Sequence, residues 1–287
     1  MTPLRQRLVD DLKLRNYSPR TIEAYLAGVA KFAKHFGRSP DRLGPDELRA
    51  FQLHLLAGGT SWSQFNQIVA SLRFFFGVTL GRAEAVPFIP YGKRPRTIPA
   101  VLSPEEVARL LDAARPGRDR VLLQTAYACG LRISELIHLQ VRDIDSARMV
   151  VIVRQGKGAK DRLVPLSQRL LVELRHYWWA HQSRLWLFPG SRPGQPLHPA
   201  GVQREFQRTL RLAGIDKRAT PHTLRHSFAT HLLEAGVDIL TVQKLLGHGS
   251  LSTTTHYLHV SRRHLQHMPS LLDLIALPAT STTEGQS

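Results

Sequence analysis

A proline-rich, basic stretch is the feature that most limits how this chain can fold. Between Glu84 and Ala100, the sequence AVPFIPYGKRPRTIPA holds four prolines. Proline lacks a backbone N–H and its ring clashes with the preceding helical turn, so no continuous helix can cross this stretch. The chain's 287 residues are enough for two domains. We therefore expect an extended linker at residues 84–100 between a domain at residues 1–83 and a second at residues 101–276.

The first domain is predicted to be a compact set of four helices. Apolar residues recur at helical spacing within it, as at Leu4, Leu8 and Leu12. Ser18, followed by a proline, is typical of a helix start, and Gly37 is typical of a helix end.

The second domain is predicted to be mainly helical with a small antiparallel β-sheet. The β-branched run MVVIVR at Met149–Arg154 indicates a strand, GKGAKD a turn, and Leu163–Pro165 the returning strand. Helices are expected at residues 103 onward, 119–138 with a break at Gly130, 167–179, 199–213, and in the segment from residue 220. Residues 277–287 are polar and are predicted to be a disordered tail.

The charge of the chain favours a polyanionic partner. Its net charge is +17, divided into +8 before Ile98 and +9 from Ile98 onward. Two basic domains favour surfaces that hold one nucleic acid, although charges spread for solubility give the same total. Membrane-surface binding is less favoured, because the chain has no long apolar run and no lipidation motif. In the linker, Lys93, Arg94 and Arg96 either follow a phosphate backbone or form a solvated tether.

Two sequence features indicate what is buried in the core and in which cellular compartment the chain works. The run Phe74–Phe76 is interpreted as core rather than as a base-stacking platform, which would need exposed aromatic rings. The single cysteine, Cys129, rules out an internal disulfide and lies among apolar neighbours, so we expect it to be buried. The N-terminus has no signal-peptide pattern, and together these features indicate a reducing, cytoplasmic environment.

The stretch from residue 220 to residue 257 predicts three short helices that bring chemically active groups together. His222 and Arg225 are three residues apart and share a helix face. Gly236 is expected to end the first helix and Asp238 to cap the second. Gly247 is expected to end the second helix.

Four side chains of this stretch suit phosphoryl transfer. His248 follows the expected end of the second helix, and Tyr257 lies on the third, with Ser252 as its expected cap. Together with His222 and Arg225 they supply cations for phosphate oxygens and a hydroxyl nucleophile. A phenol has a pKa of about 10, so it needs neighbouring cations and a proton acceptor to attack at neutral pH.

Arg132 and Lys157 are two further candidates upstream. Arg132 follows the helix break at Gly130 in an apolar segment, where a cation needs an anion. Glu135, one turn on, satisfies it structurally; alternatively Arg132 and Arg225 clamp one phosphate and Glu135 holds Arg132 in place. Lys157 lies between two glycines in the predicted turn and is either a solvated charge or a mobile proton donor.

A zinc site at His222 and His226 is the alternative that the spacing also allows. Histidines four residues apart on a helix suit zinc, but the metalloprotease motif needs a glutamate after the first histidine, where this chain has Thr223. We therefore expect no metal, and interpret His226 and His231 as packing residues or as residues that support the catalytic groups.

Four motifs in order resemble the tyrosine recombinases, also called the phage integrase family. They are ACGLRISEL, VRQGKGAKDRLVP, HTLRHSFATHLLEAG and LLGHGSLSTTTHY, over roughly the C-terminal two-thirds of the chain. The N-terminal stretch NYSPRTIEAYLAGVAKF is similar to the helical SAM-like core-binding domain of that family.

The resemblance implies DNA cutting and rejoining without metal, ATP or cofactor. Tyr257 is the implied nucleophile, forming a 3′-phosphotyrosyl link and freeing a 5′-hydroxyl. The remaining implied catalytic residues are Arg132, Lys157 (rather than Lys160), His222, Arg225 and His248. The implied fold is a two-domain, C-shaped clamp around double-stranded DNA, working as a homotetramer on two DNA sites or together with a paralogue. The candidate DNA contacts are Lys93, Arg94, Arg96, Lys160 and Arg204.

Two other functions share some of these features. A type IB topoisomerase has the same chemistry but relaxes DNA, and a DNA-binding accessory factor would not need the catalytic residues. All six implied catalytic positions are filled in this chain, which favours an active recombinase. No membrane or small-molecule substrate is expected, and the predicted location is the cytoplasm, with the nucleoid.

Overall fold

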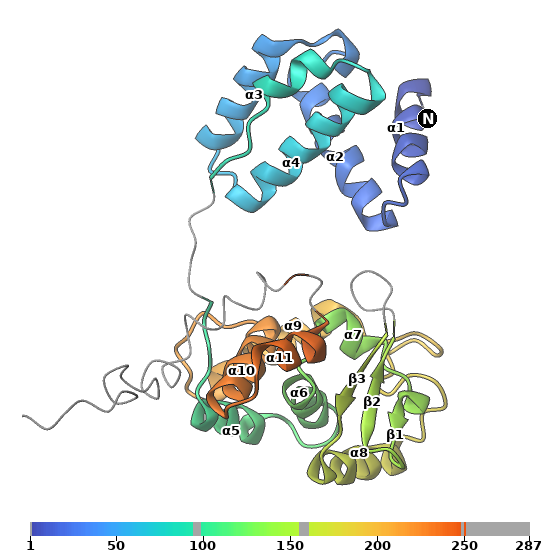
Figure 1. The fold of residues 1–287 in the computed structure, drawn as a ribbon, viewed down its shortest axis with the longest axis vertical. Helices are drawn as coiled ribbons and strands as arrows, with labels where there is room; N and C mark the ends of the chain where they lie inside the picture. Colours follow the sequence, from blue (N-terminus) through green and yellow to red (C-terminus); the bar gives the residue numbers. More distant parts are fainter. Residues whose placement is uncertain (1, 94–98, 155–160, 248–249, 251–287) are drawn as a thin grey trace, which may run out of the picture. The chain divides into compact units, whose positions relative to one another are not determined.

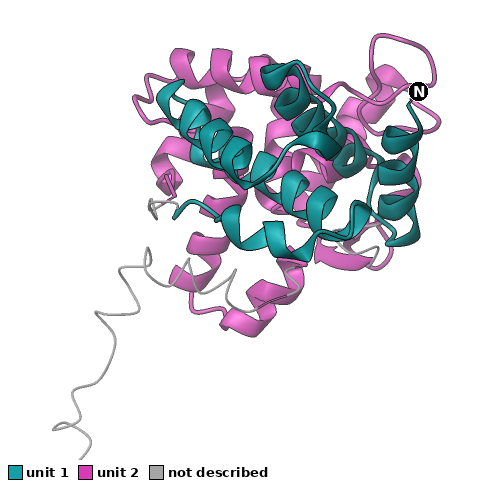
Figure 2. Ribbon diagram, turned by 90° about the horizontal axis from the view of Figure 1, so that it is seen from above, with its two compact units in different colours: residues 1–97 teal, residues 98–287 magenta. Residues whose placement is uncertain are grey.

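The chain divides into two compact units, residues 1–97 and residues 98–287 (Figure 2). This computed structural model describes residues 2–93, 99–154, 161–247 and 250. Each unit has a buried apolar core of its own. The clamp-like arrangement of two domains on DNA stays a prediction.

The first unit contains the four predicted α-helices (Figure 1), which are α1 Pro3–Leu14, α2 Pro19–Phe36, α3 Pro45–Ala57 and α4 Trp62–Phe74. Ser18 caps α2 by accepting a hydrogen bond from the backbone N–H of Thr21 at 3.2 Å. Gly37 ends the same helix with a φ of 61°, a left-handed conformation that favours glycine. The helix boundaries in this unit therefore follow the capping signals of the sequence.

A π-helical segment, Phe75–Thr79, continues α4. Phe75 and Phe76 are buried in the core of the unit, and Phe74 packs against that core. The interpretation of this aromatic run as core is confirmed.

The beginning of the expected linker is not extended. Residues Ala83–Phe88 form a 3-10 helix, and Ile89 is fully buried in the core of the first unit. The guanidinium of Arg73 donates to the carbonyl oxygens of Val86 and Ile89 at 2.9 and 2.8 Å. The expectation of an extended chain is wrong here, because these tertiary hydrogen bonds stabilise a tight turn that prolines tolerate. The domain boundaries themselves stay a prediction.

Seven α-helices are described in the second unit. They are α5 Pro104–Ala113, α6 Arg118–Ala128, α7 Ile133–Ile137, α8 Gln168–His181, α9 Pro199–Leu212, α10 Pro221–Glu234 and α11 Ile239–Leu246. The predicted break in residues 119–138 is confirmed, since α6 and α7 are separated at Gly130. Asp238 caps α11 by accepting from the backbone N–H of Thr241 at 2.9 Å.

A three-stranded antiparallel sheet lies beside these helices (Figure 1). Its strands are β1 Ile144–Asp145, β2 Val150–Val153 and β3 Arg162–Pro165, in that order. Val151 pairs with Ile144 on one side and with Val164 on the other. The predicted hairpin strands β2 and β3 are confirmed, and β1 was not predicted.

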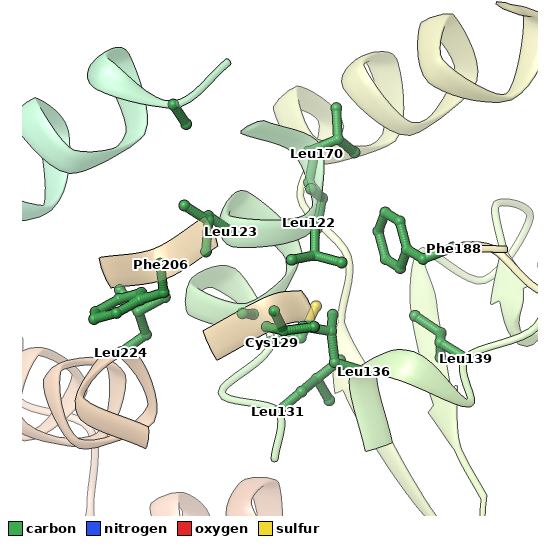
Figure 3. Packing of buried hydrophobic residues seen from close by; sticks show 14 of the residues in the cluster. Leu122, Leu123, Cys129, Leu131, Leu136, Leu139, Leu170, Phe188, Phe206 and Leu224 are labelled. Carbon is green, nitrogen blue, oxygen red and sulfur yellow. The ribbon is translucent and has the colours of Figure 1, made fainter. Parts of the chain in front are cut away.

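The core of the second unit surrounds α6, which packs against α5, α7, α8 and α10. Figure 3 shows Leu122 and Leu123 of α6 near the rings of Phe188 and Phe206. Cys129, just after this helix, is fully buried, and burial raises the pKa of its thiol to about 12. The expectation of a buried cysteine is confirmed.

Candidate active site

Helix α10 carries an arginine that points into the protein. Arg225 is buried on the same helix face as His222, as their spacing predicts. Its two terminal nitrogens donate to the carbonyl oxygens of Gly130 at 2.7 Å and Leu246 at 2.6 Å. This one guanidinium therefore ties α10 to the turn before α7 and to the end of α11.

The turn between α6 and α7 places a second arginine beside a carboxylate. Gly130 adopts a φ of 57°, which lets the chain reverse before Arg132. The backbone N–H of Arg132 donates to one carboxylate oxygen of Glu135 at 2.8 Å, and its guanidinium donates to the other at 2.6 Å. The side chain of Glu135 thus holds both the backbone and the guanidinium of Arg132, as the sequence suggested.

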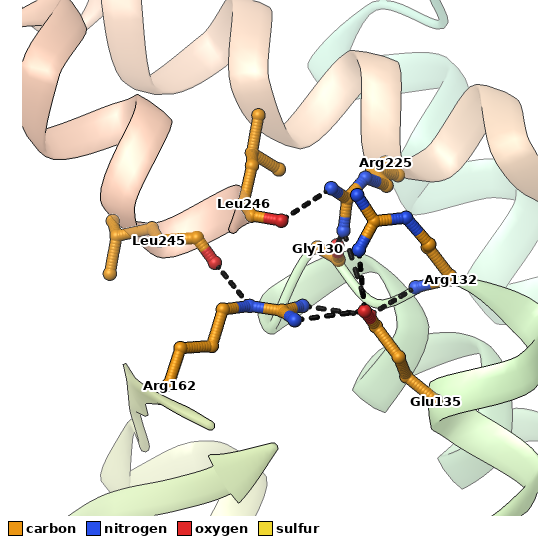
Figure 4. A network of polar contacts seen from close by, with 7 residues as sticks. All are labelled: Gly130, Arg132, Glu135, Arg162, Arg225, Leu245 and Leu246. Carbon is orange, nitrogen blue, oxygen red and sulfur yellow. Dashed lines mark hydrogen bonds and ion pairs between the residues drawn. The ribbon is translucent and has the colours of Figure 1, made fainter. Parts of the chain in front are cut away.

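Strand β3 contributes a third arginine, which sequence reasoning missed. Arg162 forms a two-pronged contact with Glu135, with N–O distances of 2.8 and 2.7 Å (Figure 4). Its Nε donates to the carbonyl oxygen of Leu245 at 2.7 Å. A signal was present: residues two apart on a strand share a face, and Val164 is buried, so Arg162 also points inward.

Glu135 thus lies among three guanidiniums, because Arg225 also forms an ion pair with it at 3.6 Å. The side chains of Arg132, Glu135, Arg162 and Arg225 are 19%, 5%, 8% and 3% exposed. Burial alone would raise the pKa of Glu135. Hydrogen bonds from Arg162 and the backbone of Arg132, with the charges of Arg162 and Arg225, instead lower it to about 2.

This cluster has two more positive than negative charges. Buried charges are costly unless they are paired. Arg132 is the most exposed of the three arginines, so the excess charge is accessible from solvent at its side. The arrangement suits an anion such as a phosphate group, with guanidinium N–H groups as donors.

His222 lies next to this cluster on α10. Its side chain is exposed, and its pKa is lowered, first by desolvation and then by the charges of Arg225 and Arg132. The ring of His226 lies edge-on to it, with 6.0 Å between ring centroids, and burial lowers the pKa of His226 to about 4. Both shifts favour the neutral imidazole, the form that accepts protons.

The other predicted site residues lie elsewhere in the two units or outside the described residues. Lys93 is exposed in the first unit, and Arg204 is exposed on α9. Gly247 ends α11 with a φ of 63°, as predicted. Six candidates lie outside the described residues, namely Arg94, Arg96, Lys157, Lys160, His248 and Tyr257.

Two further properties concern the described residues alone. They contain no group of three or more histidine, cysteine, aspartate or glutamate side chains that could hold a metal ion. None of the helices formed by the described residues is long and apolar enough to cross a membrane.

Two family models match this chain. The model of the phage integrase family matches residues 100–264, and that of its N-terminal SAM-like domain matches residues 4–84. The chain belongs to the phage integrase family. The motif resemblance and the predicted mainly helical fold with a small sheet are confirmed. The cluster around Glu135 lies within the integrase match.

Relatives and solved structures agree with this membership. The protein y4qK of Sinorhizobium fredii is 45% identical over 282 residues, covering 97% of this chain and 91% of its own. The tyrosine recombinase XerA of Pyrococcus furiosus is 40% identical over 260 residues, covering 89% and 88%.

Two structures show the same fold. A crystal structure of XerA recombinase matches with a TM-score of 0.56 and 28% identity, over 93% of this chain and 98% of that one. The lambda integrase tetramer bound to a Holliday junction matches with a TM-score of 0.72 and 20% identity, over 88% and 76%.

Proposed function

We propose that this integrase-family chain is a site-specific tyrosine recombinase that cuts and rejoins DNA through a 3′-phosphotyrosyl intermediate on Tyr257. The observation that carries the proposal is the buried group of three arginines around Glu135, with two positive charges in excess. Cleaving a phosphodiester builds negative charge on the non-bridging oxygens, and preorganised cations stabilise that charge. Arg132 and Arg225 are assigned to these oxygens, assisted by His248.

The proposed cleavage step is a transesterification. The phenol oxygen of Tyr257 forms a bond to phosphorus, and the bond from phosphorus to the 5′-oxygen breaks. His222, whose lowered pKa favours the neutral form, takes the phenol proton. Lys157 gives a proton to the leaving 5′-oxygen. The link to Tyr257 keeps a phosphoester bond, so rejoining needs no ATP, metal or cofactor.

The proposed partner is double-stranded DNA held by both domains. Residues 1–83 are assigned to DNA binding and residues 101–276 to catalysis, with phosphate contacts from Lys93, Arg94, Arg96, Lys160 and Arg204. The tetramer that lambda integrase forms on a Holliday junction supports a tetramer on two DNA sites here, made of this chain alone or with a paralogue. A DNA substrate places the proposed activity in the cytoplasm, with the nucleoid.

The two alternative functions find no support among the relatives. The relatives and solved structures described above are named as recombinases or integrases. Of the six positions that the resemblance implies, Arg132, His222 and Arg225 lie among the described residues.

Replacing Tyr257 by phenylalanine tests the proposal. The protein is incubated with genomic DNA in EDTA and denatured, and covalently attached DNA is recovered and sequenced. We expect wild-type protein to carry DNA from a recurrent site, and Tyr257→Phe to carry none, because only the nucleophilic oxygen is lost. Binding of the recovered sequence should change less than about threefold.

A matched variant controls for the loss of a hydroxyl group. Tyr91 is an exposed tyrosine in the first unit, and Tyr91→Phe should still trap DNA. Covalent DNA on the Tyr257→Phe protein, or a wild-type reaction that stops in EDTA and returns with magnesium, contradicts the proposed chemistry.

A further inference from the structure

The residue that sequence reasoning missed lies at the junction of three segments. Arg162 belongs to β3, Glu135 to α7, and Leu245 to the last turn of α11. Every nitrogen of the Arg162 guanidinium has a protein partner. Two nitrogens donate to the carboxylate of Glu135, and the third donates to the carbonyl oxygen of Leu245. A side chain engaged in this way, and only 8% exposed, is suited to hold other groups rather than to bind a substrate.

Two arginines complete the hydrogen bonds at the end of α11. The last four carbonyl oxygens of a helix have no partner within the helix. Here Arg162 satisfies Leu245, and Arg225 satisfies Leu246. Positive charges also stabilise the C-terminal end of a helix dipole. These two contacts fix the helix end relative to Glu135.

Gly247 gives an independent indication of how closely this end packs. A Cβ atom on Gly247 would lie 3.1 Å from Cδ of Arg162 and 3.4 Å from its Nη1. The absence of a side chain there lets the aliphatic stem of Arg162 lie against the helix end. The junction is therefore packed as well as hydrogen-bonded.

We propose that Arg162 is a positioning residue, which holds Glu135 and the end of α11 so that Arg132 and Arg225 meet the phosphate in one fixed geometry. This inference rests on the proposed function, since it assigns those two arginines to the phosphate. Lysine in its place keeps the charge but cannot contact both carboxylate oxygens and Leu245 together. The two arginines then lose their common anchor without losing their charge.

The test compares Arg162→Lys with wild type on two DNA substrates of the sequence that the trapping experiment recovers. One has a normal scissile phosphate, and the other has a methylphosphonate, which lacks the negative charge that the arginines neutralise. We expect single-turnover cleavage to fall at least about 100-fold on the phosphate and less than about 10-fold on the methylphosphonate. Affinity for a half-site should change less than about threefold.

Arg154→Lys is the matched control. Arg154 follows β2 and pairs through Nε with a different carboxylate, that of the buried Asp143, at 2.6 Å. It should stay within about threefold of wild type on both substrates. If Arg162→Lys does not fold, the double variant Arg162→Gln/Glu135→Gln removes the charges of these two partners together. It should show the same contrast between substrates, because Arg132 and Arg225 again lose their common anchor.

The outcomes separate the two ideas. No covalent adduct with wild-type protein overturns the proposed function and this inference with it. An active wild type with an equal loss for Arg162→Lys on both substrates means that Arg162 only supports the fold. Full activity of Arg162→Lys on the phosphate substrate means that Arg162 does not position the two phosphate-binding arginines. Either result overturns the inference alone.

Discussion

At the scale of single residues, the carboxylate of Glu135 joins three guanidiniums at one point (Figure 4). It accepts hydrogen bonds from Arg132 and Arg162 and forms an ion pair with Arg225. These partners favour its charged form, so its pKa stays at about 2 in spite of burial. The contribution of this residue to stability must therefore depend on pH.

The direction of that dependence follows from the lowered pKa. The ordinary value is 4.5, so the charged carboxylate stabilises the fold fully above about pH 5, and this stabilisation is lost as pH falls toward about 2. We expect Glu135→Gln to lower the free energy of unfolding by about 3 kcal/mol at pH 7 and by clearly less at pH 3. Denaturant unfolding of both proteins at pH 7 and at pH 3 measures this free energy.

Glu173→Gln on α8 serves as its control, because this carboxylate has no ion pair with any other described residue. Its effect should be small at both pH values. A loss for Glu135→Gln that is as large at pH 3 as at pH 7 would show that the charge of Glu135 is not what stabilises the cluster.

The sequence revealed four of the five described residues in this neighbourhood. Arg132, Glu135, His222 and Arg225 lie in motifs where local spacing predicts shared helix faces. Arg162 was not predicted, because its partners are 27 and 83 residues away in the sequence. Only the folded sheet and the end of α11 bring those groups together.

At the scale of helices, the joint between α6 and α7 depends on Gly130. Its φ of 57° is unfavourable for other residues, and a Cβ atom there would lie 2.4 Å from Cδ1 of Phe228 on α10. We expect Gly130→Ala to destabilise the protein by about 2–4 kcal/mol, from backbone strain and overpacking together. The measurement is denaturant unfolding of the full chain.

Gly214→Ala separates these two causes. Gly214 also has a positive φ, of 62°, but a Cβ atom there meets nothing within 4 Å. This variant should cost only about 1 kcal/mol, the strain alone. Equal losses for the two variants would mean that the contact with Phe228 carries no penalty and that α10 moves away freely.

Helix ends were predictable because capping residues act locally. Ser18, Gly37, Asp238 and Gly247 each end or begin a helix as expected. The two-residue strand β1 was not predicted, since it is too short to show alternation. The 3-10 helix after α4 was missed because its stability comes from Arg73 of another helix.

At the scale of the whole molecule, the positive charge is shared by both units. The net charge is +8 before Ile98 and +9 after it. If both contact DNA phosphates, the logarithm of the association constant should fall steeply with the logarithm of salt concentration. Removing residues 1–97 should flatten that slope, because fewer counterions are released. An unchanged slope in a truncated protein that unfolds cooperatively would mean that the first unit does not contact DNA.

The division into two units and the family were predictable from sequence, because proline placement and motif order are properties of the chain itself. How the two domains hold DNA depends on contacts with the duplex. The spacing of residues along the chain does not determine that arrangement, so the clamp stays a prediction.

The most direct measurement is the identity of the residue that carries DNA. Wild-type protein is trapped on DNA in EDTA, digested with nuclease and trypsin, and its peptides are sequenced by mass spectrometry. The expected peptide spans residues 245–262, LLGHGSLSTTTHYLHVSR, in which Tyr257 is the one tyrosine. The account predicts a nucleotide joined through its 3′-phosphate to Tyr257. A nucleotide on any other residue, or joined through its 5′-phosphate, would contradict it.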